Sequence, residues 1–126
     1  MGLSVDHISD AALIASLRRQ MTIAVARQVA SAGNLANVDT PGYKALEPTF
    51  ADALAGQIGE GLNTDAPNLQ VRMQEVEGLQ ARRDGNTVQI DRELLGMGRA
   101  AGDFSAAQTA LAAKFRLVRY AINEGR

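Results

Sequence analysis

The chain has 126 residues, about the length of one domain, and contains 22 alanines but only three Phe, two Tyr and no Trp. Aromatic side chains bury about 150–250 Å² each, so this composition argues against a thick, ligand-enclosing core and favours closely packed helices. The 13 Lys and Arg against 14 Asp and Glu give a net charge of −1, which excludes the basic footprint of a nucleic-acid-binding protein. The lack of cysteine excludes disulfides, thiolate catalysis and cysteine-bound zinc.

An amphipathic helix is predicted from about Ile8 to about Leu35. Its apolar stripe advances by alternating steps of three and four residues and then continues slightly rotated, as a straight helix does against a seven-residue repeat. The stripe consists first of Ile14, Leu17, Met21 and Ala24, and then of Val25, Val29 and Ala32. His7, the only histidine, has no carboxylate partner at a helical spacing, so we expect no catalytic or metal-binding role for it.

The N-terminus lacks the pattern of a cleaved secretion signal. No Lys or Arg precedes Arg18, and the apolar run Ala11–Ala15 is too short for a signal-peptide core. No segment approaches the roughly 18 apolar residues of a membrane span, so no transmembrane segment is expected. These features alone predict a cytoplasmic protein.

A dense motif, residues 34–44, follows the first helix. We expect Asn34 or Asn37 to end the helix in a left-handed conformation, which Asn tolerates better than most residues. The tetrapeptide Thr40-Pro41-Gly42-Tyr43 fits a type II turn, with Pro setting φ at the second position and Gly supplying a positive φ at the third. Physical reasoning leaves two interpretations open, a generic helix stop and a specialised junction.

The middle of the chain, residues 38–90, is predicted to be irregular with a short β element. Residues 56–68 are rich in Gly, Asn, Asp and Pro and indicate a turn-rich linker. The alternating run Leu69–Gln74 predicts a strand, Asp84-Gly85-Asn86 predicts a turn, and Thr87–Ile90 predicts a second short strand.

A second helix is predicted over residues 91–126, with Asp91 as its N-cap and Glu93 in its first turn. Its stripe keeps a regular alternation of three and four over four heptads, which is typical of coiled coils. The stripe consists of Leu94, Met97, Ala101, Phe104, Gln108, Leu111, Phe115, Val118 and Ile122. Three early glycines predict either a frayed start or a close-approach face along the ridge Gly98, Gly102, Ala106 and Ala110.

The two helices match in length and each has one apolar stripe, so the sequence predicts a mainly α fold. We expect one domain over residues 1–126 in which residues 1–37 and 91–126 pack as an antiparallel coiled-coil-like pair, with both chain ends at one end. No cluster of residues has the pattern of a catalytic, metal or cofactor site, so the prediction is a protein that is not an enzyme and has no cofactor.

Two motifs resemble those of a known family. The stretch Asn34, Leu35, Ala36, Asn37, then Thr40, Pro41, Gly42, Tyr43 and Lys44 resembles the N-terminal signature of bacterial flagellar rod and hook proteins. The stretch Asp84, Gly85, Asn86, Thr87, Val88, then Asp91, Arg92 and Glu93 resembles a segment of that family's proximal rod members, whose short length this chain also shares.

The resemblance implies a structural subunit that polymerises helically in the flagellar basal body and is exported by the type III apparatus without a cleaved signal. It implies as partners the chain itself, other rod proteins, the rod-to-ring adaptor, the membrane ring protein and the export gate. We expect the helices to assemble, within and between subunits, through Ile14, Leu17, Met21, Val25, Leu94, Met97, Phe104, Leu111, Phe115, Val118 and Ile122. The alternatives are a sibling rod protein and a small soluble coiled-coil adaptor or export chaperone.

Overall fold

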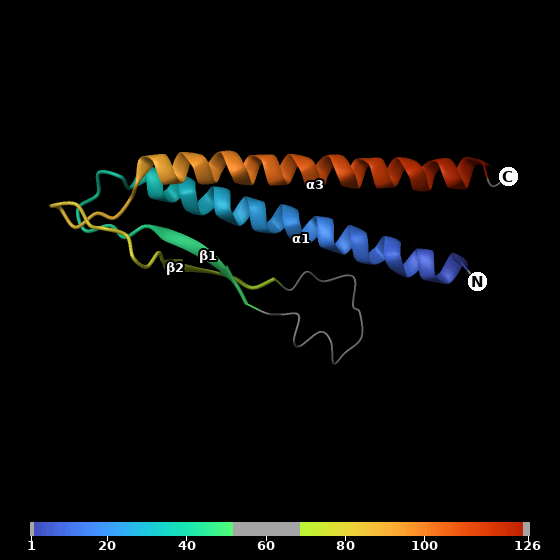
Figure 1. Ribbon diagram of the computed structural model, residues 1–126, viewed down its shortest axis with the longest axis horizontal. Helices are drawn as coiled ribbons and strands as arrows, with labels where there is room; N and C mark the ends of the chain where they lie inside the picture. The colour runs from blue at the N-terminus through green and yellow to red at the C-terminus, as the bar shows by residue number, and fades with distance from the viewer. Residues whose placement is uncertain (1, 52–68, 125–126) are drawn as a thin grey trace.

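A computed structural model describes residues 2–51 and 69–124 of the chain, with the side chains described from residue 10 onward. It contains two helices, α1 (Gly2–Ala36) and α3 (Ile90–Glu124), and two strands, β1 (Leu46–Phe50) and β2 (Val71–Glu75) (Figure 1). The predicted fold class is therefore confirmed: the protein is mainly helical with a short β element in the middle. The predicted linker at residues 56–68 lies outside the described residues.

The two helices pack antiparallel. Gly96 of α3 lies beside Ser31 of α1, and Lys114 of α3 forms an ion pair with Asp10 of α1. Higher residue numbers of α3 therefore lie beside lower residue numbers of α1. Figure 1 shows both chain ends at the same end of the molecule, with the helices nearest to each other at the opposite end. Each helix is 35 residues long, about 52 Å at 1.5 Å per residue.

The face of α3 that packs on α1 lies one position before the predicted stripe. Ala100 and Ala107 are buried, whereas the predicted stripe members Ala101 and Gln108 are exposed. Four large residues of the predicted stripe are exposed in the single chain: Leu94, Phe115, Val118 and Ile122. Three others are half-buried: Met97, Phe104 and Leu111. Alanine occupies the interface between the helices because the distance between helix axes depends on side-chain size, and small residues let the helices lie closer.

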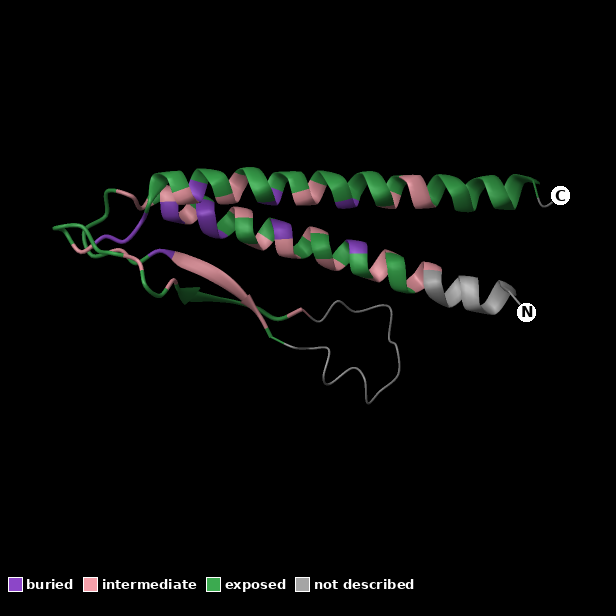
Figure 2. Ribbon diagram, viewed as in Figure 1, coloured by how far each residue is buried: buried purple, intermediate pink, exposed green. Residues whose placement is uncertain are grey.

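The predicted stripe of α1 is correct over its first half only. Leu17 and Ala24 are buried, and the other two members, Ile14 and Met21, are half-buried. Val25, Val29 and Ala32, expected to continue the stripe, are exposed. The buried face instead continues through Ala30, Ser31 and Asn34, because near its C-terminal end α1 packs on β1 as well as on α3 (Figure 2).

The start of α3 differs from its prediction. The helix begins at Ile90, and the Glu93 N–H donates to the Gln89 carbonyl, so Asp91 lies inside the first turn and is not the N-cap. The helix continues through all three early glycines, which contradicts a frayed start. A Cβ at Gly98 or Gly102 would meet nothing within 4 Å, so this ridge makes no close approach to α1; a Cβ at Gly96 would lie 3.4 Å from Ser31 Oγ.

The sheet pairs β2 with a strand that the sequence did not predict. β1 runs antiparallel to β2, with Leu46 opposite Glu75 and Phe50 opposite Val71. The predicted strand Leu69–Gln74 is confirmed as β2, but the predicted strand at Thr87–Ile90 is wrong. Its first residue hydrogen-bonds to Tyr43 and its last residue begins α3. β1 contacts both α1 and β2, and β2 is exposed throughout (Figure 2).

Candidate functional site

The two motifs singled out in the sequence lie against each other at the end of the molecule opposite the termini (Figure 1). The Gly42 N–H donates to the Asp84 carbonyl at 2.8 Å, and the Thr87 N–H donates to the Tyr43 carbonyl at 3.0 Å. We call this region, residues 34–47 and 82–93, the junction. It joins the C-terminal end of α1, the start of β1 and the start of α3, so it fixes how the helices and the sheet meet.

The predicted turn at Thr40–Tyr43 is confirmed. Gly42 has φ = 75°, and the Tyr43 N–H donates to the Thr40 carbonyl at 3.2 Å, as a type II turn requires. Gly85 of the second motif also has a positive φ, 83°, and a Cβ there would lie 3.4 Å from the Gly42 Cα. The two glycines therefore allow both turns to adopt left-handed backbone and to lie in contact.

Asn34 is the central polar residue of the first motif and is fully buried. Its side-chain Nδ2 donates to the Leu46 carbonyl at 2.9 Å, and its Oδ1 accepts from the Leu46 N–H at 2.9 Å. The same oxygen accepts from the Tyr43 hydroxyl at 3.3 Å. The side-chain amide thus occupies the position of a neighbouring strand and attaches α1 to β1.

Neither Asn34 nor Asn37 ends α1 in a left-handed conformation, because no described residue other than glycine has a positive φ. Asn37 instead returns to the last turn of the helix. Its N–H and its Nδ2 both donate to the Gly33 carbonyl, at 3.2 and 2.8 Å. The last carbonyls of α1 are therefore satisfied by side-chain and turn bonds, the usual alternative to a glycine cap.

Asn86 has the corresponding role in the second motif and is also fully buried. Its Nδ2 donates to the carbonyls of Asn37 and Thr40, both at 2.9 Å, and its Oδ1 accepts from the Val88 N–H at 2.7 Å. A single side chain therefore holds the first motif and the approach to α3 together. A residue of another shape at this position would leave the part-buried carbonyls of Asn37 and Thr40 without this donor.

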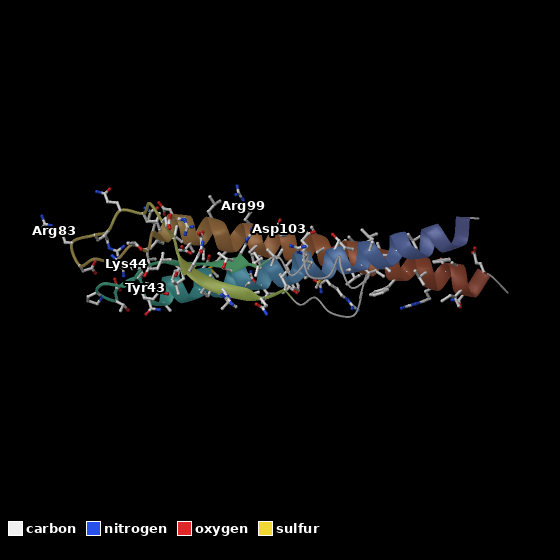
Figure 3. All side chains as sticks on the ribbon, turned by 90° about the horizontal axis from the view of Figure 1, so that it is seen from below. Tyr43, Lys44, Arg83, Arg99 and Asp103 are labelled. Carbon is white, nitrogen blue, oxygen red and sulfur yellow. The ribbon has the colours of Figure 1, made fainter. Side chains whose placement is uncertain are left out.

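Further bonds between the motifs surround these two amides. The Ala45 N–H donates to Thr87 Oγ1 at 2.8 Å, and Lys44 Nζ donates to the Gly85 carbonyl at 2.7 Å. Ala45 and Val88 are the buried apolar residues of the junction. Figure 3 shows Tyr43 and Lys44 in this region, with Arg83 pointing away from the molecule at its tip.

Arg82 is a junction residue that the sequence analysis missed. Its guanidinium donates to the Val88 carbonyl at 2.7 Å and also to the Val38 carbonyl, so it links the first motif to the second. In the sequence it forms only a short basic pair with Arg83, and nothing in that pair predicts carbonyl partners on distant segments. The one sequence signal for a junction role is that Arg82 lies two residues before the Asp84-Gly85-Asn86 turn.

An ion-pair network connects the junction to the helices. Glu93 is almost fully buried and accepts from Arg92 Nη1 at 2.8 Å, while Arg92 Nη2 lies 3.7 Å from Glu47 of β1. These residues line an open groove of about 420 Å³ between α1, β1 and α3. Three arginines and three carboxylates face it, namely Arg27, Arg92, Arg99, Glu47, Glu93 and Asp103. The formal charges of these six side chains sum to zero.

The remaining residues of the two motifs are less buried than the two amides of the junction. Leu35 is half-buried, whereas Ala36, Pro41 and Asp91 are exposed. The predicted assembly residues lie elsewhere, along the two helices, and Leu94 alone among them is next to the junction. The structure therefore separates a polar junction from the helix surfaces, on which five of the predicted assembly residues are exposed: Val25, Leu94, Phe115, Val118 and Ile122.

No family model matches the chain, and no curated protein matches it either. The resemblance to flagellar rod and hook proteins accordingly stays a prediction. Within residues 10–51 and 69–124, whose side chains the structure describes, no group of three or more His, Asp or Glu residues is placed to hold a metal ion. In the same part of the chain, neither helix has a stretch long and apolar enough to cross a membrane.

Proposed function

We propose that this chain is a structural subunit of the proximal rod of the bacterial flagellar basal body, similar to the rod protein FlgB. In this proposal it is synthesised in the cytoplasm, exported by the flagellar type III apparatus without a cleaved signal, and polymerised helically in the periplasm-spanning rod. The two motifs that resemble the family support the proposal, because they form one interlocked junction and not two unrelated surface loops.

The exposed apolar surface of the helices is the observation that carries the assembly role. Leu94 and Ile122 of α3 are 56% and 68% exposed, and Phe115 and Val118 lie between them on the same stripe. On α1, Val25 and Val29 are exposed as well. Monomeric proteins rarely expose long apolar stripes, and such surfaces mark interaction sites. Neighbouring subunits in a helical assembly would cover them.

The proposed mechanism separates two tasks. The junction fixes the geometry of each subunit through buried hydrogen bonds, and the stripes supply the apolar contacts between subunits. The implied partners are further copies of the chain, other rod proteins, the rod-to-ring adaptor, the membrane ring protein and the export gate. No catalytic chemistry or cofactor is required for any of these roles.

Two alternatives remain as second candidates. The sibling rod protein FlgC is the first, but its C-terminal helix usually carries a Ser-Arg-x-Tyr-Gln-Ala-Asn stretch that Phe104–Ala110 does not match. A small coiled-coil adaptor or export chaperone is the second, and the exposed stripes would suit it equally well. Such a protein has no need of the junction motifs, so we favour the rod subunit.

The test is deletion of the gene followed by electron microscopy of basal bodies and complementation. We expect basal bodies without a complete rod, rescued by the wild type and by Arg116→Gln, an exposed change outside the stripe. The stripe variant Leu94→Gln/Phe115→Gln/Ile122→Gln should fold but fail to rescue. Complete rods in the deletion strain would overturn the proposal, and a tagged protein that stays in the cytoplasm would identify a chaperone instead.

A further inference from the structure

The two free edges of the β1–β2 sheet differ in their hydrogen-bonding state. The bonds from the Ala51 N–H to the Gln70 carbonyl and from the Val76 N–H to the Ala45 carbonyl fix which positions bond inside the pair. Because the pattern alternates along an antiparallel ladder, the backbone groups of Leu46, Pro48 and Phe50 point outward from β1. Those of Val71, Met73 and Glu75 point outward from β2.

The outer edge of β1 is closed. Asn34 occupies both the N–H and the carbonyl of Leu46 through its side-chain amide. Pro48 has no N–H to offer, and β1 lies against α1. An incoming strand would therefore find one donor only, at Phe50. This edge is protected by the means that natural proteins use against strand addition.

Among the residues that the structure describes, none protects the outer edge of β2 in these ways. Every residue of β2 is exposed, including the apolar side chains of Val71 and Met73, which are 38% and 42% exposed. No proline, helix or side-chain amide covers the outward groups of Val71, Met73 and Glu75 in the described part of the chain. An open edge of this kind is a template for an added strand.

We propose that β2 pairs with β2 of a second copy of this chain to form a four-stranded antiparallel sheet. A second copy can offer only its own β2, because its β1 edge is closed, so the contact joins the same edge of both copies and has two-fold symmetry. An axis at Met73 is the one position that pairs all five residues of each strand. It sets Arg72 opposite Gln74 and Val71 opposite Glu75, which places no like charges directly opposite each other.

The pair is a property of the free chain and does not rest on the proposed rod function. Its two-fold symmetry also distinguishes it from the contacts of a helical assembly. Subunits of a helical filament all point the same way through head-to-tail contacts, whereas the two copies in this pair point in opposite directions. The β2 pair must therefore separate before its members join a rod.

Disulfide mapping tests the pairing directly, because the chain has no cysteine and each introduced one can pair only between copies. Met73→Cys would set the two sulfur-bearing residues opposite each other, at a Cα separation of about 5.5 Å, within disulfide range. Glu75→Cys is the matched control, since its two copies would lie about 13 Å apart at 3.3 Å per residue. We expect a covalent dimer at least about tenfold faster for Met73→Cys. Equal rates would overturn the pairing.

Sedimentation of the same purified chain tests the hydrogen bonds. Met73→Pro removes an outward N–H without touching the bonds to β1, whereas Met73→Ala keeps that N–H and removes the side chain. We expect Met73→Pro to weaken dimerisation at least about tenfold more than Met73→Ala. A wild-type chain that stays monomeric at high concentration would overturn the proposal. So would a dimer that survives Met73→Pro and is lost in the stripe variant. These sedimentation results leave the proposed rod function untested, because that function is tested by microscopy of basal bodies.

Discussion

Asn34 of α1 and Leu46 of β1 exchange two hydrogen bonds, one from the Asn34 Nδ2 to the Leu46 carbonyl and one from the Leu46 N–H to the Asn34 Oδ1, both at 2.9 Å. A side-chain amide thus replaces a strand, because it presents a donor and an acceptor with the spacing of a peptide group. This contact links helix to sheet and at the same time closes one edge of the sheet. Asn34, the first residue of the first motif, therefore both attaches α1 to β1 and closes the outer edge of β1.

Asn34→Ala is expected to lower the free energy of unfolding by about 2–4 kcal/mol, because the part-buried backbone groups of Leu46 and the Tyr43 hydroxyl lose their buried partner. Urea unfolding followed by circular dichroism measures the change. Asn123→Ala, at an exposed position of α3, is the matched control and should change stability by less than about 0.5 kcal/mol. Equal effects of the two substitutions would contradict the assigned role.

The same substitution at two glycines is expected to have opposite signs. Gly42→Ala should cost about 1–2 kcal/mol, because an L residue is strained at φ = 75° although nothing lies within 4 Å of its Cβ. Gly98→Ala should stabilise by about 1 kcal/mol, because Gly98 lies in a helix with open space around it. Thermal unfolding of both variants checks the pair. Destabilisation by Gly98→Ala would show a close contact at that position.

Arg92→Ala is expected to destabilise the fold by about 1–3 kcal/mol, because it leaves the buried carboxylate of Glu93 without its cation. The control is Asp10→Ala, which removes an ion pair with Lys114 at a more exposed site and should cost less than about 1 kcal/mol. Adding Glu93→Gln to Arg92→Ala should restore part of the loss. A double-mutant cycle measures that coupling, and zero coupling would refute the assignment.

The helix interface predicts a contrast between small and large residues of α3. Ala107→Leu should cost about 1–3 kcal/mol, because the buried methyl group lies where the helices meet and a larger side chain forces them apart. Ile122→Gln should leave the stability of the isolated chain within about 0.5 kcal/mol, because that side chain is mostly exposed. Chemical unfolding of the dilute chain distinguishes them. The reverse order would favour the stripe expected from the sequence.

Much of the junction was predictable from local chemistry. The Pro41-Gly42 pair specified the turn without reference to the rest of the chain, because Pro restricts φ and Gly permits positive values. The motif 84–93 was recognised as a unit, although its contact with residues 37–45 was not. β1 was not predicted, and Pro48 is acceptable in it only because the position of its absent N–H faces outward from the sheet. Arg82 was missed because its two carbonyl partners are distant in sequence.

The sequence by itself determined the two long helices, the turn at Thr40–Tyr43, the strand near Val71 and the mainly helical class. Each of these follows from periodicity or from the backbone preference of a few adjacent residues. Only the tertiary structure decided which face of α3 meets α1 and which segment pairs with β2. Periodicity cannot distinguish two neighbouring stripes on one helix, and it carries no information on close approach. Ala100 and Ala107 lie in the interface because small side chains let the helices approach each other. The larger side chains of Leu94, Phe115 and Ile122 are exposed.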